Sequence, residues 1–424
     1  MDGAGIEDRF AVFVAAIGSV LGHARRAEHC EQYIAALNLP LERKSIEPIA
    51  ARVDPTNVRQ RHQALHHFVA DAPWVDERVL RVCREFVVPE LEKHAPIDAL
   101  ILDDSGFPKK GTHSVGVARQ HCGVLGKVAN CQVLVTASLA SAMGSVPVAH
   151  RLYLPKVWAE DMERRQKAKV PKEVEFATKP EIGLALIDRL MSEGVEIPHV
   201  LGDAAYGDPS RFRADLTERG LTYTLGVTYN TTVWPPGKKP LPPSPRGKYV
   251  RRTKEHRPVQ AAELAQSLDP KKFEEVEWAE GTKGKMTSRF AAIRVRPAQG
   301  EEKRTEAWPV QWLLIEWPEG EEAPTKYWLS TLPAKTPLKR LVYLAKLRWR
   351  IERDYQELKD ELGMDHYEGR GWRGLHHHIT LCIAAYAFLI AERLRLFPPP
   401  RPRLTFGLPP LPRGFKPRGS PGSG

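Results

Sequence analysis

The 424-residue sequence predicts a mixed α+β fold: a βββαβαβ sheet flanked by helices, with an all-α N-terminal domain and an all-β insertion. Three observations predict it. Apolar residues recur at helical spacing through residues 5–95. Short apolar or alternating segments, typical of strands, begin at residue 97. Between residues 273 and 332, four segments have strand composition and no long helix lies among them.

The expected domain boundaries follow these changes of pattern. We expect a helical domain at 1–95 and the first part of the core at 96–228. A β-rich insertion at 229–334, a helical second part of the core at 335–395 and a disordered basic tail at 396–424 follow. In the first domain, RQRHQALHHFV at 59–69 gives one helix a basic, histidine-rich face, for which a solvated surface is the preferred explanation. A DNA-binding role for this domain is left open.

The first core part starts with IDALILD at 97–103, a short buried strand. Strands follow at 113–126, 129–140 and 146–155, and their short links, with a turn at Gly126, predict an antiparallel meander. A helix, a strand, a helix and a strand then alternate, at 180–192, 199–203, 210–220 and 221–227. This is the order of a ribonuclease H-like sheet, in which parallel strands are added to three antiparallel ones.

The net charge of +11 is concentrated in two proline-rich segments. Residues 235–258 hold eight Lys or Arg residues against one acid, and residues 396–424 hold five and no acid. Such segments bury little apolar surface, and basic arms suit a polyanion because contacts with phosphates release counterions. We therefore expect a nucleic acid as partner, with solubilising linkers as the alternative.

Several classes of protein are not expected. The sequence has no apolar stretch long enough to span a membrane, and helix 375–395 is expected to be a core helix. The start, MDGAGIEDRF, lacks the pattern of a signal peptide. The five cysteines are scattered without a CxxC pair, which indicates neither a zinc knuckle nor a disulfide framework and fits a reducing cytoplasm.

Three acidic residues stand at positions that suit catalysis. Asp103 ends the first predicted strand, Asp203 ends HVLGD, and Glu352 lies on a predicted helix, 337–362, capped by Thr336 and ended by Gly363. In a ribonuclease H-like sheet the first and fourth strands are neighbours, so we expect all three carboxylates to converge. Such carboxylates hold two divalent cations about 3.5–4 Å apart, and Mg²⁺ prefers oxygen ligands.

The predicted helix 337–362 supports this site. At 100° per residue, Arg348, Glu352 and Lys359 share one stripe and the leucines another. The alternative is a salt-bridged surface helix with i,i+4 pairs, here Arg348–Glu352, Arg350–Asp354 and Arg353–Glu357. The helix alone favours this alternative, as Asp103–Asp104 alone favours a turn; only the joint placement of the three acids favours the metal site.

Three blocks carry a resemblance to a known family: ILDDSGFPKKGTHSVGVARQHCG, VLGDAAYGD and RWRIERDYQELKDELG. Together they resemble the DDE transposases of bacterial insertion sequences, in the branch with a β-strand insertion and the helix signature Y-x2-R-x3-E-x6-K. Arg348, Glu352 and Lys359 fit that spacing, whereas Ala345 stands at the Tyr position. In the family a Ser or Thr follows one residue after the first acid, so Ser105 indicates Asp103 rather than Asp104.

The resemblance implies metal-dependent cleavage of DNA at transposon terminal inverted repeats and transfer of the 3′-hydroxyl into target DNA. It implies two Mg²⁺ (or Mn²⁺) ions on Asp103, Asp203 and Glu352, a homodimer on DNA, and a cytoplasmic, nucleoid-associated bacterial protein. Arg348 and Lys359 would bind terminal phosphates. Three further cations either line the DNA path or are ordinary surface charges: Lys109, Lys110 and Arg119. Trp349 is expected to pack in the core rather than to stack on a base.

Two alternatives belong to other classes. A phosphohydrolase of the haloacid dehalogenase type also begins with an Asp after a strand, but its general acid would fall on Ser105. A DNA-binding protein derived from a transposase would have lost catalysis, although all three acids are present here. The tract His376–His377–His378 is not expected to bind a metal, because three consecutive helical residues point in different directions.

Overall fold

The computed structural model describes residues 5–242, 253, 255–281, 284–300 and 306–397. The chain forms two compact units, one of Met1–Ile197 with Leu347–Pro399 and one whose described part is Pro198–Lys346. The N-terminal helices thus share a unit with the first core strands, and the β-rich segment shares a unit with the later ones. The predicted disordered tail, apart from residues 396–397, and residues 243–252 and 254 of the basic segment lie outside the described residues.

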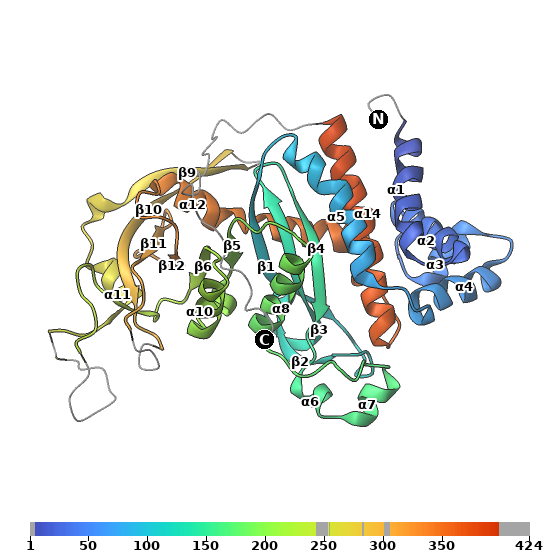
Figure 1. The fold of residues 1–424 in the computed structure, drawn as a ribbon, viewed down its shortest axis with the longest axis horizontal. Coiled ribbons are helices and arrows are strands. Elements are labelled where there is room, and N and C mark those ends of the chain that lie inside the picture. The colour runs from blue at the N-terminus through green and yellow to red at the C-terminus, as the bar shows by residue number, and fades with distance from the viewer. Residues whose placement is uncertain (1–4, 243–252, 254, 282–283, 301–305, 398–424) are drawn as a thin grey trace, which may run out of the picture. The chain divides into compact units, whose positions relative to one another are not determined.

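The N-terminal part of the first unit is helical, as predicted. Its helices, with one π-helical turn η1, are α1 (Ile6–Val20), α2 (Ala24–Leu37), α3 (Ile46–Val53), α4 (Val58–His66), η1 (His67–Asp71) and α5 (Asp76–Glu92). Helix α5 lies along the long helix α14 (Trp372–Leu396), and α1 and α2 pack against this pair (Figure 1). Phe13 of α1 contacts the rings of Phe86 on α5 and Phe388 on α14. All five cysteines are free and buried.

The sheet of the first unit is antiparallel, with β3 at its centre. Its strands are β1 (Ile97–Pro108), β2 (Ala118–Cys122), β3 (Lys127–Ser141) and β4 (Ser145–Leu152). Strand β3 pairs directly with β1 and with β4, while the short β2 pairs only with the first residues of β3. The predicted antiparallel pairing of consecutive strands, β2 with β3 and β3 with β4, is confirmed, whereas β1 pairs with β3 and not with β2, its neighbour in sequence. The predicted turn at Gly126 is confirmed by its positive φ of 60°.

Strand β1 is longer than predicted. Its pairing with β3 runs from Ile97 to Pro108, so Asp103 lies in the middle of the strand and not at its end. The pairing continues because the residues after the two acids are buried; a Cβ at Gly106 would lie 2.8 Å from Cys122 Sγ. Proline, which has no N–H to donate, then ends the strand.

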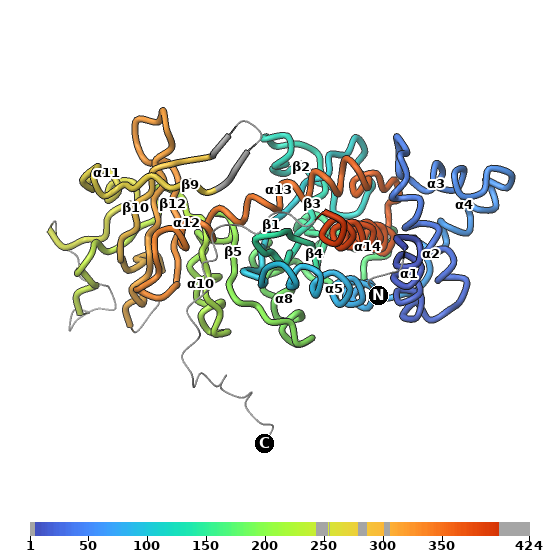
Figure 2. Tube along the Cα trace, turned by 90° about the horizontal axis from the view of Figure 1, so that it is seen from above, coloured from blue at the N-terminus to red at the C-terminus, as the bar shows by residue number. Residues whose placement is uncertain are grey.

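Helices cover both faces of this sheet. Helix α8 (Lys179–Ser192) packs on β3 and β4, and α13 (Arg350–Gln356) packs on β1 and β4 from the opposite face (Figures 1 and 2). Two short helices, α6 (Lys156–Ala159) and α7 (Met162–Lys167), precede α8. Helix α14 is buried along most of its length, which confirms a core helix. Within the described residues, no helix combines the length and apolarity that a membrane span needs.

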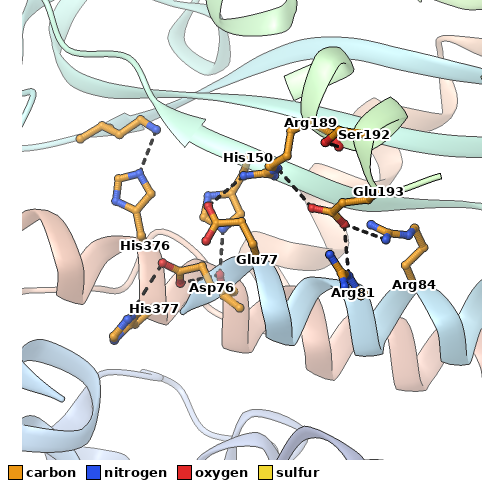
Figure 3. A network of polar contacts seen from close by, with 12 residues as sticks. Asp76, Glu77, Arg81, Arg84, His150, Arg189, Ser192, Glu193, His376 and His377 are labelled. Carbon is orange, nitrogen blue, oxygen red and sulfur yellow. Dashed lines mark hydrogen bonds and ion pairs between the residues drawn. The ribbon is translucent and has the colours of Figure 1, made fainter. Parts of the chain in front are cut away.

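Buried polar contacts tie α5, α8, α14 and β4 together (Figure 3). Thr380 Oγ1 lies 2.9 Å from both Asp76 Oδ1 and His150 Nε2, and Glu193 pairs with Arg84 at 2.8 Å. His376 and His377 bond to different backbone groups, and His378 lies 2.9 Å from Tyr33 Oη. The three consecutive histidines therefore make separate buried hydrogen bonds in the core of the first unit.

The second unit contains a mixed sheet. Its strands are β5 (Val200–Gly202), β6 (Tyr223–Val227), β7 (Thr232–Trp234), β8 (Val259–Gln260), β9 (Glu274–Gly281), β10 (Gly284–Pro297), β11 (Gln311–Trp317) and β12 (Lys326–Ser330). They lie in the order β5-β6-β12-β11-β10-β7-β8, with β9 on β10; β5 and β6 are parallel and the other pairs antiparallel. Because β12 pairs with β6, the predicted β-rich insertion continues this sheet.

Helices of the second unit connect and cover its strands. They are α9 (Ala204–Gly207), α10 (Ser210–Glu218), α11 (Ala261–Gln266), the 3₁₀ turn η3 (Pro270–Lys272) and α12 (Leu338–Leu347), whose last residue belongs to the first unit. Lys346 of α12 forms a 2.6 Å ion pair with Glu316 of β11. Among the described residues the two units together give a mixed α+β fold with helices flanking its sheets.

The single helix predicted for 337–362 is wrong. The chain forms α12, breaks at Arg348–Trp349, continues as α13, and ends in a π-helical turn, η5 (Glu357–Glu361). Thr336 does not cap α12, since its Oγ1 is buried without a hydrogen-bond partner. Gly363 ends the segment as predicted, with φ 66°. The break and the wider π turn change which side chains face the sheet.

His199, just before β5, predicts an acid-sensitive second unit. Burial lowers the pKa of His199 to about 3, Arg340 adds to this shift, and both ring nitrogens contact threonine hydroxyls, Thr222 and Thr224. The unfolded chain takes up a proton near pH 6.5 and the folded one does not, so stability is present at neutral pH and lost as pH falls. We expect His199→Gln to remove about 2 kcal/mol of the stability difference between about pH 7.5 and pH 5, measured by urea unfolding.

The comparison of wild type and variant isolates His199 from the other buried histidines, which both proteins retain. An unchanged dependence of the unfolding free energy on pH in the variant would show that this imidazole is protonated in the folded protein as readily as in the unfolded one.

Candidate active site

Asp103 is held in place by the neighbouring strand β3 and by Arg348, just before helix α13. It is buried, with 8 % of its surface exposed, and it lies opposite Thr136 in the register of β1 and β3. The backbone N–H of Asp104 donates to Asp103 Oδ1 at 2.8 Å, and Arg348 Nη1 donates to Oδ2 at 2.6 Å. The ladder fixes the backbone and these two donors fix the carboxylate, so this acid has a defined orientation.

Arg348 links Asp103 to Glu352. Its second terminal nitrogen, Nη2, donates to Glu352 Oε1 at 3.2 Å, so one guanidinium contacts both carboxylates. Arg348 lies at the break before α13, and the side chain of Glu352 remains 58 % exposed. The structure therefore brings together three of the predicted site residues on one face of β1: Asp103, Arg348 and Glu352.

Asp104 faces the other side of the sheet. Alternation along a strand turns consecutive side chains to opposite faces, and Asp104 Oδ2 accepts from Lys179 Nζ of α8 at 2.9 Å. Asp103, in contrast, shares the face covered by α13. The geometry thus supports Asp103 rather than Asp104 as the partner of Glu352.

Buried hydroxyls lie beside Asp103 that the sequence did not indicate. Tyr355 of α13 lies 2.6 Å from Thr136 Oγ1, and burial, together with the charge of Asp103, raises the pKa of Tyr355 well above its usual value. Asp354, which the alternative of a surface helix would pair with Arg350, is buried between Ser145 and Tyr386, and burial raises its pKa to about 7. In the sequence, only the positions of Asp354 and Tyr355 on the inward side of α13 could have indicated these contacts.

Two of the predicted phosphate-binding lysines are turned inward. Lys359 Nζ donates to Gly106 O at 3.1 Å and lies over the ring of Phe107, and Lys109 Nζ donates to Tyr367 O at 3.0 Å. Burial lowers the pKa of both lysines. Their ammonium groups bond to backbone carbonyl groups in this structure.

The other predicted cations are accessible. Lys110, after β1, and Arg119, on β2, are exposed. Trp349 is 47 % exposed, so the expectation that it packs in the core is wrong; it lies at the break between α12 and α13. Ala345, at the position of the signature Tyr, is buried on α12.

Asp203 belongs to the second unit. It follows β5 and caps α9, where its Oδ1 accepts from the N–H of Ala205 at 2.9 Å. Gly207 and Gly226 bring α9 close to β6, since a Cβ at Gly207 would lie 1.7 Å from Gly226 O. The convergence of Asp203 with Asp103 and Glu352 stays a prediction, because these acids belong to different compact units.

The donors of the first unit suit a divalent metal by their chemistry. Asp103 and Glu352 offer hard oxygen ligands, and both contact one positive charge, the Arg348 guanidinium. Within the part of the chain that the structure describes, no three His, Cys, Asp or Glu side chains gather closely enough to hold a metal ion. Asp103 and Glu352 are thus a pair of carboxylates joined by one guanidinium.

Comparison with known proteins places the chain in a family. The family described as DDE superfamily endonuclease matches residues 17–285, which include Asp103 and Asp203. The chain belongs to this family. This membership removes the haloacid dehalogenase-type phosphohydrolase from the alternatives, and it implies catalysis with divalent metal ions.

Two individual proteins are similar to the chain. A probable transposase for insertion sequence element IS701 of Microchaete diplosiphon is 35% identical over 191 residues, which are 45% of this chain and 46% of that protein. The chain thus spans about half the length of this curated relative. The crystal structure of the NurA nuclease from Sulfolobus solfataricus matches with a TM-score of 0.24 and 6% identity, over 63% of this chain and 80% of that one.

Proposed function

We propose that this protein is a transposase that cleaves DNA at the terminal inverted repeats of an insertion sequence and transfers the 3′-hydroxyl into target DNA. The observation that carries the proposal is the pair of carboxylates, Asp103 and Glu352, held on one face of β1 by Arg348. Membership of the DDE superfamily endonucleases and the relative described as a probable transposase support it.

We further propose that Asp103, Asp203 and Glu352 together hold two Mg²⁺ or Mn²⁺ ions in a ribonuclease H-like core. The antiparallel β1, β3 and β4 and the parallel pair β5 and β6 support this fold. When bound, such ions activate the attacking oxygen and stabilise the leaving one. Asp103 positions its oxygens from a rigid strand, and Glu352 reaches the same place from α13.

Arg348 has two tasks in this proposal. Without DNA its single positive charge reduces the repulsion between the two carboxylates. With DNA its planar guanidinium suits a terminal phosphate, to which it can donate two parallel hydrogen bonds. The exposed Lys110 and Arg119 extend the positive surface, and we expect two copies of the chain to act on paired transposon ends.

The test is cleavage of a labelled duplex that carries the inverted repeat flanking the gene. We expect nicks at the transposon end with Mg²⁺ or Mn²⁺ and none after EDTA treatment, followed by joining to a target plasmid. Small phosphomonoesters should not be hydrolysed under the same conditions. A shifted duplex without nicks in any divalent ion would instead identify a DNA-binding protein that has lost catalysis.

A further inference from the structure

A basic pocket lies in the second unit, and its lining residues do not include Asp103, Asp203 or Glu352. It has a volume of about 180 Å³ and is formed by residues 235–239, strand β10 and Val310. Four of its lining residues are cations and none is an acid: Lys238, Lys239, Arg294 and Arg296. A recess with this composition repels cations and attracts an anion.

The two arginines of the pocket are held in fixed orientations. Arg294 and Arg296 are two residues apart on β10, so they project from the same face of the strand. Arg294 Nη2 donates to Val310 O at 2.7 Å, and its guanidinium lies over the ring of Trp312. Arg296 Nη1 donates to Trp308 O at 2.6 Å. Guanidinium groups anchored in this way lose little freedom when they bind a ligand.

The four cations of the pocket have no carboxylate partner among the residues that the structure describes. Within the described residues, none of the four cations forms an ion pair, and Arg294 Nη1 is buried without a hydrogen-bond partner. Burial also lowers the pKa of Arg294. A partly desolvated charge with a free donor is stabilised by an anion that accepts hydrogen bonds.

The lysines come from a constrained turn. Gly237 has φ 77°, and the N–H of Lys238 donates to Pro235 O at 3.0 Å, which closes the turn. Lys238 Nζ donates to Glu255 O, and Lys239 O contacts His256 Nε2 at 2.8 Å. The turn therefore presents both lysines at the rim of the pocket, where they are exposed.

We propose that this pocket binds a phosphate of a nucleic-acid backbone, at a site separate from Asp103 and Glu352. Two neighbouring guanidinium groups match a phosphodiester, and two exposed lysines extend the contact to adjacent phosphates. The choice of DNA rather than a free phosphate rests on the proposed function. The contact adds affinity that does not depend on base sequence.

The test compares three full-length proteins: wild type, the double variant Arg294→Gln/Arg296→Gln, and Arg289→Gln. Binding of a short fluorescent duplex of arbitrary sequence is followed by anisotropy over a range of salt concentrations. We expect the double variant to bind about threefold to tenfold more weakly at low salt. The slope of log K against log[salt] should become less negative by about 1.

Arg289 is the matched control. Arg289 lies five residues before Arg294 on β10, an odd separation that turns its side chain to the other face of the strand. Its guanidinium lies 4.1 Å from the ring centroid of Trp317, as that of Arg294 lies over Trp312. Arg289→Gln should leave the salt slope unchanged. If the double variant should fail to fold, the exposed pair Lys238→Gln/Lys239→Gln provides the same test, with an expected loss in the same direction.

The outcomes separate this inference from the proposed function. Wild-type cleavage of the transposon end together with unchanged binding by the pocket variants would overturn the inference and leave the transposase proposal intact. Absence of any DNA binding by wild type would overturn both. A calorimetric titration with inorganic phosphate distinguishes the source of the ligand: phosphate binding lost in the variants, with duplex binding retained, would overturn the assignment to DNA.

Discussion

Replacing Asp103 by Asn, or Glu352 by Gln, is expected to lower the rate of metal-dependent DNA cleavage at least about a thousandfold, equivalent to about 4 kcal/mol of transition-state stabilisation. Each change keeps the shape of the side chain but removes a charge on which the proposed cations depend. Strand nicking and strand transfer with Mg²⁺ measure the effect. Because the amides can still accept a hydrogen bond from Arg348, we expect cooperative thermal unfolding to be retained.

A nearby acid serves as the control for each variant: Asp104 for Asp103, and Glu357 for Glu352. Asp104→Asn changes a carboxylate on the opposite face of β1, where it pairs with Lys179. Glu357→Gln changes one on the next turn, where it pairs with Arg353 and Arg393. Neither carboxylate is a proposed metal ligand, so both controls should stay within about threefold of wild type. Activity retained by Glu352→Gln, or lost equally by Asp104→Asn, would contradict the assignment.

Gly207→Ala is expected to reduce the free energy of unfolding by about 3 kcal/mol or more. Its Cβ would lie 1.7 Å from the backbone oxygen of Gly226, a contact that no side-chain rotation relieves. Helix α9 would have to move away from β6, and Asp203, which caps this helix, would move with it. Urea unfolding followed by circular dichroism measures the loss.

Gly123→Ala is the control for this steric argument. A Cβ at Gly123 meets no atom within 4 Å, so the same chemical change should alter the unfolding free energy by less than about 1 kcal/mol. Equal stabilities of Gly207→Ala and wild type would mean that α9 and β6 are not in the close contact described.

Much of the fold could be predicted because hydrophobic periodicity and turn-forming residues are local features of the sequence. The helices before residue 95, helix α8 and the strands β9–β12 follow from such signals. The extension of β1 to Pro108 does not, since two successive acids resemble a strand exit. Its partner β3 decides this point: pairing and burial continue through Ser105 and Phe107. Tertiary contacts of this kind override local preference.

The candidate site was predicted in part. Asp103 and Glu352 were proposed from their positions and from the resemblance; the predicted helix stripe implies the contact of Glu352 with Arg348, and the contact of Asp103 with Arg348 comes from the packing of the helix on β1. The break at Arg348–Trp349 was not predicted because no proline or glycine marks it. Tyr355 and Thr136 were missed because a tyrosine on an apolar helix face and a threonine in a strand are common core residues. Their meeting depends on how α13 packs against β3.

The two acids that meet at Arg348 differ in freedom. Asp103 is anchored in a paired strand and buried, whereas Glu352 lies exposed on a seven-residue helix, between the interruption at Arg348–Trp349 and a π-helical turn. Ordering a long exposed side chain costs conformational entropy, and a buried one has already lost it. In the proposed reaction, one ligand is thus preorganised and the other adjustable. In such a site the Asp103 carboxylate stays in place, while the Glu352 carboxylate can change position between hydrolysis and strand joining.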